Sequence, residues 1–182
     1  MTNFKYAKKD KLITSQVFKN MLKSAEKAWV KSLLVYLYLY GVRITEAIRI
    51  NLEDLTIESF NNVEYLIANS PTLKNRKVHN RRIYMPLNTV YLPILLGYMD
   101  GHKGGRLWPY SRVWAWKHVT ALNPEVSPHV FRHNRLTRFA QDEATAFQIQ
   151  SFAGHSDLRP ASSYIQTSGV ITRKLVEGRI IR

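Results

Sequence analysis

Cysteine is absent from the 182 residues of the sequence. Its absence excludes disulfide scaffolds, thiolate zinc sites, iron–sulfur clusters and thiol nucleophiles. Long apolar stretches are lacking too, because the longest, residues 32–42, is far below the roughly 20 residues that cross a bilayer. No signal-peptide pattern opens the sequence either, so we expect a cytoplasmic protein.

Acidic side chains are scarce, with 13 Asp and Glu against 27 Lys and Arg, for a formal net charge of +14. Between Glu64 and Glu125 the only acidic residue is Asp100, whereas the same interval holds Lys74, Arg76, Lys77, Arg81, Arg82, Lys103, Arg106, Arg112 and Lys117. A positive potential of this kind favours a polyanion, and nucleic acid is the leading candidate. An anionic membrane surface is the rival, but the basic residues do not lie opposite an apolar stripe on one helix, so we expect no membrane partner.

The composition is that of a folded protein, with 45% hydrophobic and 12% aromatic residues. At roughly 100–200 residues per domain, the length predicts a single domain. We expect that domain to span residues 1–182, with an N-terminal extension over residues 1–10 and a C-terminal tail over residues 165–182. No internal repeat or heptad run indicates a second domain.

Helical patterns dominate the sequence. A capped helix begins at Thr14 or Ser15, and residues 29–40 are apolar almost all round, which predicts a buried helix that ends at Gly41. Further helices are predicted near residues 44–52, 91–99 and 112–122. Ser127 and Pro128 open another, and Asp142 is the expected cap of the next.

Residues 54–87 have a different pattern, with short apolar runs at 55–57, 63–67 and 83–85. These runs predict three antiparallel strands, the last two joined by a long basic turn over residues 72–82. The predicted fold class is therefore α+β, mostly helical with a small three-stranded antiparallel sheet. Within the basic turn, Arg76, Lys77, Arg81 and Arg82 are the candidate DNA contacts.

Two histidines of the helix that starts at Ser127 have the spacing seen on zinc-binding helices. However, Val130 follows His129 where a zinc protease has its glutamate, and no third ligand accompanies His129 and His133. Paired carboxylates for hydrolysis and a glycine-rich phosphate loop are also missing. We therefore expect no metal and no cofactor.

Three short motifs carry a resemblance to a known family. They are GVRITEA at residues 41–47, HVFRH at residues 129–133 and AGHS at residues 153–156, followed by Tyr164. In this order and at this spacing they resemble the conserved boxes of the tyrosine recombinases, also called the phage integrase family. The resemblance runs from about residue 11 to residue 164 and includes the three-stranded segment. It implies a DNA-recombining enzyme.

The resemblance assigns roles that the chemistry of the residues can support. Tyr164 is implied as the nucleophile, which joins DNA as a 3′-phosphotyrosyl ester. Arg43 and Arg132 offer fixed forks of donors to the charged phosphate oxygens. His129 and His155 are implied to bond the same phosphate, and His129 to assist proton transfer with the tyrosine.

A lysine of the hairpin is implied as the proton donor to the 5′-oxygen. Alignment around residues 72–75 selects Lys74, and Lys77 is the alternative, because the loop is longer than is common in the family. As the resemblance implies, Glu46 is expected to orient Arg43 or neighbouring structure rather than to do chemistry.

The implied partners are double-stranded DNA and further copies of the chain. We expect a tetramer on DNA that is weakly associated or monomeric without it, with the C-terminal tail exchanged between protomers or packed in cis. Family members usually carry a separate N-terminal DNA-binding domain, so the chain is either a minimal recombinase or the catalytic part of a longer integrase. A mobile element or virus is the commonest setting.

Two other functions remain open from the sequence. A type IB topoisomerase uses a similar set of residues, although those enzymes have lysine at the position that His129 occupies here. A DNA-binding accessory factor that has lost catalysis is the second, although all the expected catalytic residue types are present.

Overall fold

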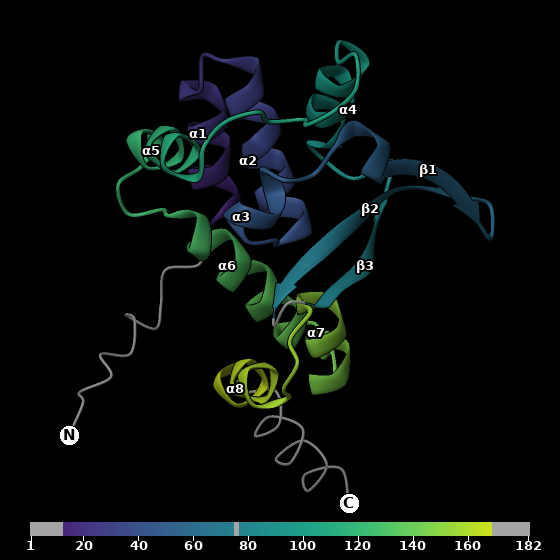
Figure 1. The fold of residues 1–182 in the computed structure, drawn as a ribbon. Helices are drawn as coiled ribbons and strands as arrows, with labels where there is room; N and C mark the ends of the chain where they lie inside the picture. The colour runs from purple at the N-terminus through teal and green to yellow at the C-terminus, as the bar shows by residue number, and fades with distance from the viewer. Residues whose placement is uncertain (1–12, 75–76, 169–182) are drawn as a thin grey trace, which may run out of the picture.

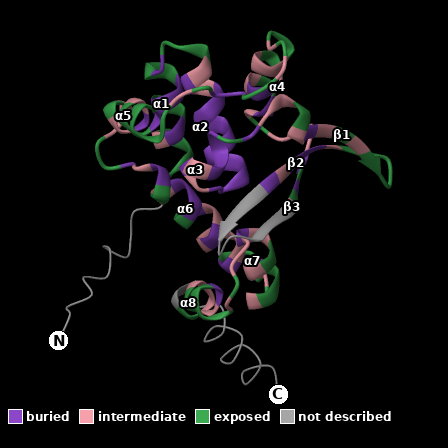
Figure 2. Ribbon diagram, viewed as in Figure 1, coloured by how far each residue is buried: buried purple, intermediate pink, exposed green. Residues whose placement is uncertain are grey.

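Helix α2 (Ala28–Tyr40) lies at the centre of the protein, and most of its side chains are buried (Figure 2). The structure is a computed structural model that describes residues 13–74 and 77–168, with the backbone alone for residues 71–74, 77–80, 167 and 168. The other elements are α1 (Ser15–Ser24), α3 (Ile44–Ala47), a 3₁₀ turn (Leu52–Asp54), β1 (Leu55–Phe60), β2 (Val63–Lys74), β3 (Lys77–Pro86), α4 (Leu92–Asp100), α5 (Arg112–Leu122), α6 (Pro128–Gln141), α7 (Ala146–Ala153) and α8 (Arg159–Ser168) (Figure 1). In this part of the chain no helix is long and apolar enough to cross a membrane.

Helix α1 begins at its predicted cap, and α2 ends at its predicted glycine. The hydroxyl of Thr14 accepts a hydrogen bond from the backbone N of Val17 (3.2 Å), which caps α1. Helix α2 ends at Gly41, whose φ of 56° is left-handed and whose N donates to the carbonyl of Leu37 (3.1 Å). This turn brings the chain directly to Arg43, the N-cap residue of α3.

The three strands form one antiparallel sheet in the order β1-β2-β3, which confirms the predicted α+β class. One face of the sheet belongs to the core and buries Leu55, Leu66, Ala68, Ile83 and Met85. On α2, the hydroxyl of Tyr40 donates to the carbonyl of Leu66 (3.0 Å) and so ties the sheet to the central helix.

The predicted basic turn over residues 72–82 is wrong in extent. Strand β2 continues to Lys74 and β3 already begins at Lys77, with Leu73 paired to Val78 and Lys74 to Lys77. Apolar alternation marks only the part of a strand that packs on a core, whereas backbone pairing continues without it. The basic segment is therefore mostly the far end of a long hairpin.

The last three helices extend away from the main core. Helix α6 runs from the core toward the far ends of β2 and β3, where α7 and α8 pack against it (Figure 1). A second, smaller apolar cluster holds these three helices together; its buried members are Leu136, Ala140, Ile149, Ala153 and Ala161.

The start of α7 differs from the prediction. Asp142 follows the end of α6 and does not cap α7, which begins four residues later at Ala146. Thr145 is the cap instead: its hydroxyl accepts from the N of Gln148 (3.2 Å), and the Gln148 side chain accepts from the N of Thr145 (2.8 Å). This reciprocal Thr-x-x-Gln pair satisfies two helix donors, where a lone aspartate would satisfy one.

The left-handed turn at Gly41 gives a test of the fold. We expect Gly41→Ala to lower the free energy of unfolding by about 1–3 kcal/mol, because alanine is strained at positive φ and its Cβ would lie 2.9 Å from that of Arg135. Gly97→Ala, inside α4 with open space around its Cβ, is the control and should stabilise by about 0.5–1 kcal/mol. Urea unfolding followed by circular dichroism measures both, and a Gly41→Ala midpoint equal to that of the parent would contradict the expectation.

Candidate functional site

Arg43 is fixed by a buried carboxylate. Its Nη1 donates to Oε1 of Glu46 (2.7 Å), and its backbone N donates to Oε2 (3.0 Å). The Glu46 side chain is fully buried, whereas 34% of the Arg43 side chain remains exposed. These bonds show that Glu46 orients Arg43, whose side chain stays partly exposed.

Arg132, in the second turn of α6, is buried among carbonyl groups. Its Nη1 donates to the carbonyl of Gly41 (3.1 Å), and its Nη2 donates to the carbonyl of Ala153 (2.6 Å) and lies 3.1 Å from Nε2 of His155. Burial lowers the pKa of Arg132 to about 10, and the positive Arg43 nearby acts in the same direction. The group still remains charged at neutral pH.

Tyr164 lies half-buried in α8, within electrostatic range of both arginines. Burial raises the pKa of its phenol, while the positive charges of Arg132 and Arg43 oppose that rise. Its ring centroid lies 5.4 Å from that of His133 on α6. The structure thus brings Arg43, Arg132 and Tyr164 together, with His155 in contact with Arg132.

Arg81 is placed differently from the exposed DNA contact that the sequence predicted. Only 10% of its side chain is exposed, and its Nη2 donates to the second oxygen of Glu46 (2.8 Å). Its Nη1 donates to the carbonyl of Phe152 (2.9 Å). Burial lowers the pKa of Arg81, and the Glu46 carboxylate opposes that effect. Arg81 is therefore a buried partner of Glu46. Its neighbour Arg82 is exposed and pairs with Glu58.

His129 is exposed in the first turn of α6, one turn before the buried Arg132. Residues three apart share a helix face, so His129 lies on the same face of α6 as Arg132. Its side chain forms no hydrogen bond or ion pair with the described side chains and backbone, and its role stays a prediction.

The hairpin residues of the predicted site are described only in part. Lys74 and Lys77 pair with each other across β2 and β3, but their side chains lie outside the described atoms. Arg76 lies outside the described residues. The choice of Lys74 as proton donor, and the DNA contacts at Arg76 and Lys77, stay predictions.

Arg43, Arg81, Arg132, His133, His155 and Tyr164 form one cluster in the structure. The sequence did not place two of them, Arg81 and His133, at this site. Arg81 was grouped with the hairpin cations, and His133 was weighed only as a metal ligand. His133 directly follows Arg132, which was the one local sign that it would lie near the site. Its pKa is lowered by burial, so its imidazole is neutral at neutral pH.

The cluster has the electrostatics of an anion site. Three guanidiniums, those of Arg43, Arg81 and Arg132, act on one another, and one carboxylate, Glu46, offsets them in part. A phosphate, which accepts several charge-assisted hydrogen bonds, is the group that such forks match. Among the described residues, no three His, Asp or Glu side chains are grouped to hold a metal ion.

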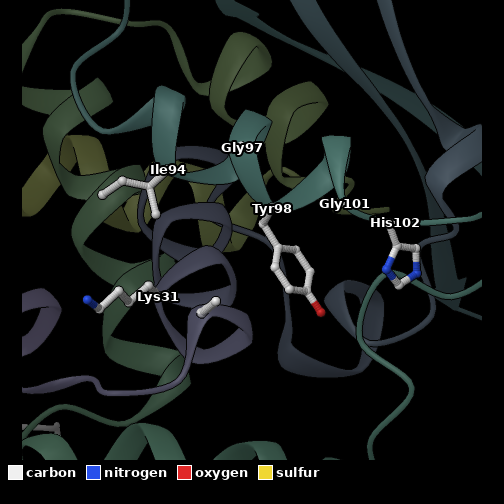
Figure 3. A pocket seen from close by; sticks show the side chains of 7 residues that line it. Lys31, Ile94, Gly97, Tyr98, Gly101 and His102 are labelled. Carbon is white, nitrogen blue, oxygen red and sulfur yellow. The ribbon is translucent and has the colours of Figure 1, made fainter.

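A separate cavity of about 400 Å³ lies between α2 and α4 (Figure 3). Lys31, Tyr98 and His102 are among the residues that line it, and none of the clustered arginines does. It is therefore distinct from the candidate site.

No family model matches the chain. Individual proteins do: the tyrosine recombinase XerC of Rickettsia africae (strain ESF-5) is 32% identical over 154 residues, which cover 76% of this chain and 47% of that protein. XerC of Rickettsia prowazekii (strain Madrid E) is 30% identical over the same length and coverage. The chain thus spans about half the length of the curated relatives that it matches.

Solved structures share the fold. The crystal structure of XerA recombinase aligns with a TM-score of 0.68 at 17% identity, covering 93% of this chain and 65% of that one. XerH recombinase bound to its difH substrate, in a pre-cleavage complex, aligns with a TM-score of 0.62 at 16% identity, covering 83% of this chain and 48% of that one. By its sequence relatives, with a fold that agrees, this chain belongs to the tyrosine recombinase family.

Proposed function

We propose that the chain is the DNA-cleaving part of a site-specific, integrase-like recombinase that cuts and rejoins duplex DNA without metal or ATP. The observation that supports the proposal is the convergence of Arg43, Arg132, His155 and Tyr164 from three separate stretches of sequence. Membership of the tyrosine recombinase family supports the interpretation of that cluster as a DNA-cleaving site.

In the proposed cleavage step, Oη of Tyr164 attacks the phosphorus of one phosphodiester and the P–O5′ bond breaks. The phosphate stays on the 3′ side as a phosphotyrosyl ester, and the 5′-oxygen takes a proton from Lys74, with Lys77 as the alternative. The phenolic proton goes to an imidazole, that of His129 or of His133. Attack on the ester by the 5′-hydroxyl of another strand reverses the step, so the bond energy is kept and no nucleotide is consumed.

The arginines supply the electrostatic part of the proposed catalysis. Negative charge builds up on the non-bridging oxygens in the transition state, where preorganised donors stabilise it. Arg132 is held rigid by two carbonyls, and Arg43 by Glu46, so neither has to reorganise when the phosphate arrives.

The proposed substrate is double-stranded DNA, supported by the net charge of +14 and by the related XerH structure, which is bound to its difH substrate. We further propose that four copies assemble on DNA; in support, Phe147 on α7 and Leu158 ahead of α8 are large apolar side chains left 71% and 44% exposed. A cytoplasmic, nucleoid-associated protein fits that substrate. An origin in a mobile element or virus stays a prediction.

Replacement of the nucleophile tests the proposed function. A pool of short duplexes of randomised sequence, each with one nick, is incubated with the full chain and resolved on a denaturing gel. The nick lets the 5′-hydroxyl fragment diffuse away, so a covalent adduct should accumulate with the parent. It should vanish with Tyr164→Phe, which keeps the ring and loses the attacking oxygen.

Tyr110→Phe is the matched control, because that ring packs on Trp29 (4.2 Å between centroids) and should keep the adduct. An absence of adduct across the pool would instead indicate a DNA-binding factor without catalysis. Relaxation of supercoiled plasmid regardless of its sequence would indicate a topoisomerase-like enzyme.

We expect Arg132→Lys to slow adduct formation by about 10²–10³-fold, the usual loss when a transition-state donor is removed. One ammonium cannot bond the carbonyls of Gly41 and Ala153 and still present a fork to phosphate. Arg138→Lys is the control, since among the described residues Arg138 donates one side-chain hydrogen bond, to the carbonyl of Ile13 (3.0 Å), and lies over the ring of Tyr38, both of which a lysine can replace. Equal losses in both variants would show a folding defect rather than lost catalysis.

The pH dependence follows from two shifted pKa values. Burial raises the pKa of Tyr164 and lowers that of His133, so near pH 7 the phenol is protonated and the imidazole is neutral and able to accept its proton. The initial adduct rate should then be level from about pH 7 to 9 and fall only below the ordinary histidine value of about 6.5. His133→Gln should abolish the level region if His133 is the base. A tenfold rise per pH unit in the parent would show attack by free tyrosinate and contradict a role of His133 as the base.

A further inference from the structure

Arg81 joins two parts of the site that are far apart in the sequence. One end of its guanidinium bonds Glu46, which precedes the sheet, and the other bonds the carbonyl of Phe152 at the end of α7. With 10% of its side chain exposed, Arg81 has little surface left to meet DNA. The hydrogen bonds by which Arg81 can act on the site are those to these two partners.

The first partner, Glu46, needs both of its arginines. One carboxylate oxygen bonds Arg43 and the other bonds Arg81, and the carboxylate itself is fully buried. Without Arg81, this charge would be buried against a single arginine that is one-third exposed. A buried carboxylate with too few hydrogen-bond partners is destabilised, so the groups around it shift to bond it again. The orientation of Arg43 therefore depends on Arg81.

The second partner is the C-terminal end of α7. The last carbonyls of a helix lack intrahelical donors and form its negative end. Here two consecutive carbonyls each accept a hydrogen bond from a guanidinium: the carbonyl of Phe152 from Arg81, and that of Ala153 from Arg132. His155 follows two residues later and contacts Arg132. Arg81 therefore also holds the turn that supports Arg132 and carries His155.

Arg81 anchors the hairpin as well. In the register of β2 and β3 it pairs with Ser70, and the Lys74–Lys77 pair lies four residue pairs farther along. The hairpin of β2 and β3, which carries the proposed proton donor Lys74, is thus fastened to α3 and α7 through the Arg81 side chain on β3.

We propose that Arg81 is a positioning residue of the cleavage reaction: it holds Glu46 and the end of α7, and through them it sets the guanidiniums of Arg43 and Arg132. The proposal rests on the proposed function for the reaction that is positioned. It replaces the expectation that Arg81 contacts DNA.

The first experiment needs no cleavage. Hydrogen exchange of arginine guanidinium protons, followed by NMR in the full chain, reports how firmly Arg43 is held. Arg81→Gln should speed exchange at Arg43 by about tenfold, as expected for weakening of a charge-assisted hydrogen bond. Arg138→Gln, which also removes a charge and a bond to a backbone carbonyl, should leave exchange at Arg43 unchanged. Unchanged exchange at Arg43 in folded Arg81→Gln overturns the proposal. If Arg81→Gln does not fold, the same measurement is made on Arg81→Lys, which can reach only one of the two partners.

The second experiment measures adduct formation on the nicked duplex that reacts best. Arg81→Gln should slow the reaction by about 10²-fold, comparable to loss of a transition-state donor, and Arg138→Gln should change it little. Arg81→Gln combined with Glu46→Gln should be no slower than Arg81→Gln alone, because the uncompensated carboxylate is gone. A further, multiplicative loss in the double variant overturns the proposal.

A charge-neutral substrate separates positioning from general structural damage. A methylphosphonate at the cleaved position removes the negative charge that Arg43 and Arg132 stabilise. The ratio of parent to Arg81→Gln rates should therefore fall toward one on this substrate, and an unchanged ratio overturns the proposal. If the parent forms no adduct on any duplex, the proposed function fails, and the exchange experiment alone decides the role of Arg81.

Discussion

The buried carboxylate of Glu46 is the interaction on which the site depends. A phosphate site needs several cations close together, and such groups repel one another: at an effective dielectric constant of about 20, unit charges about 4 Å apart interact by about 4 kcal/mol. Glu46 offsets this repulsion by bonding Arg43 and Arg81 with different oxygens. Breaking a buried ion pair by removing one partner costs about 3–5 kcal/mol. The carboxylate and its two arginines therefore act as one unit.

Two helix ends complete the arrangement around Arg132. Both α2 and α7 end at a glycine with left-handed φ, Gly41 at 56° and Gly154 at 62°. The carbonyl of Gly41 itself, and that of Ala153 just before Gly154, accept hydrogen bonds from Arg132. The negative ends of two helices thus meet at one buried guanidinium, which favours its charged form despite burial. A residue of the site follows each glycine closely in the sequence: Arg43 after Gly41, and His155 after Gly154.

Local features of this site could be predicted from the sequence because residues close together in the sequence determine each of them. The glycine ends, the Thr14 cap and the sheet are of this kind. The place of Arg81 could not be, because Arg81 and Arg82 are adjacent and a strand sends adjacent side chains to opposite faces. In the strand register Arg81 lies opposite Ser70, and its side chain is on the core face of the sheet. The side chain of Arg82 is on the other face, where it forms an ion pair with Glu58. A shift of one residue would exchange them, and composition carries no sign of which occurs.

The tyrosine lies on the part of the molecule that has the smaller apolar core. Tyr164 packs at the edge of the cluster that joins α6, α7 and α8, apart from the main core around α2. Small apolar clusters give less protection against local opening than large ones do, so polar bonds matter more there. Those bonds run from Arg81 to Phe152 and from Arg132 to Ala153. Arg81 and Arg132 take up these positions only when α7 is docked, and α7 is docked in part by these two arginines, so the clustered cations and the helices around Tyr164 assemble together.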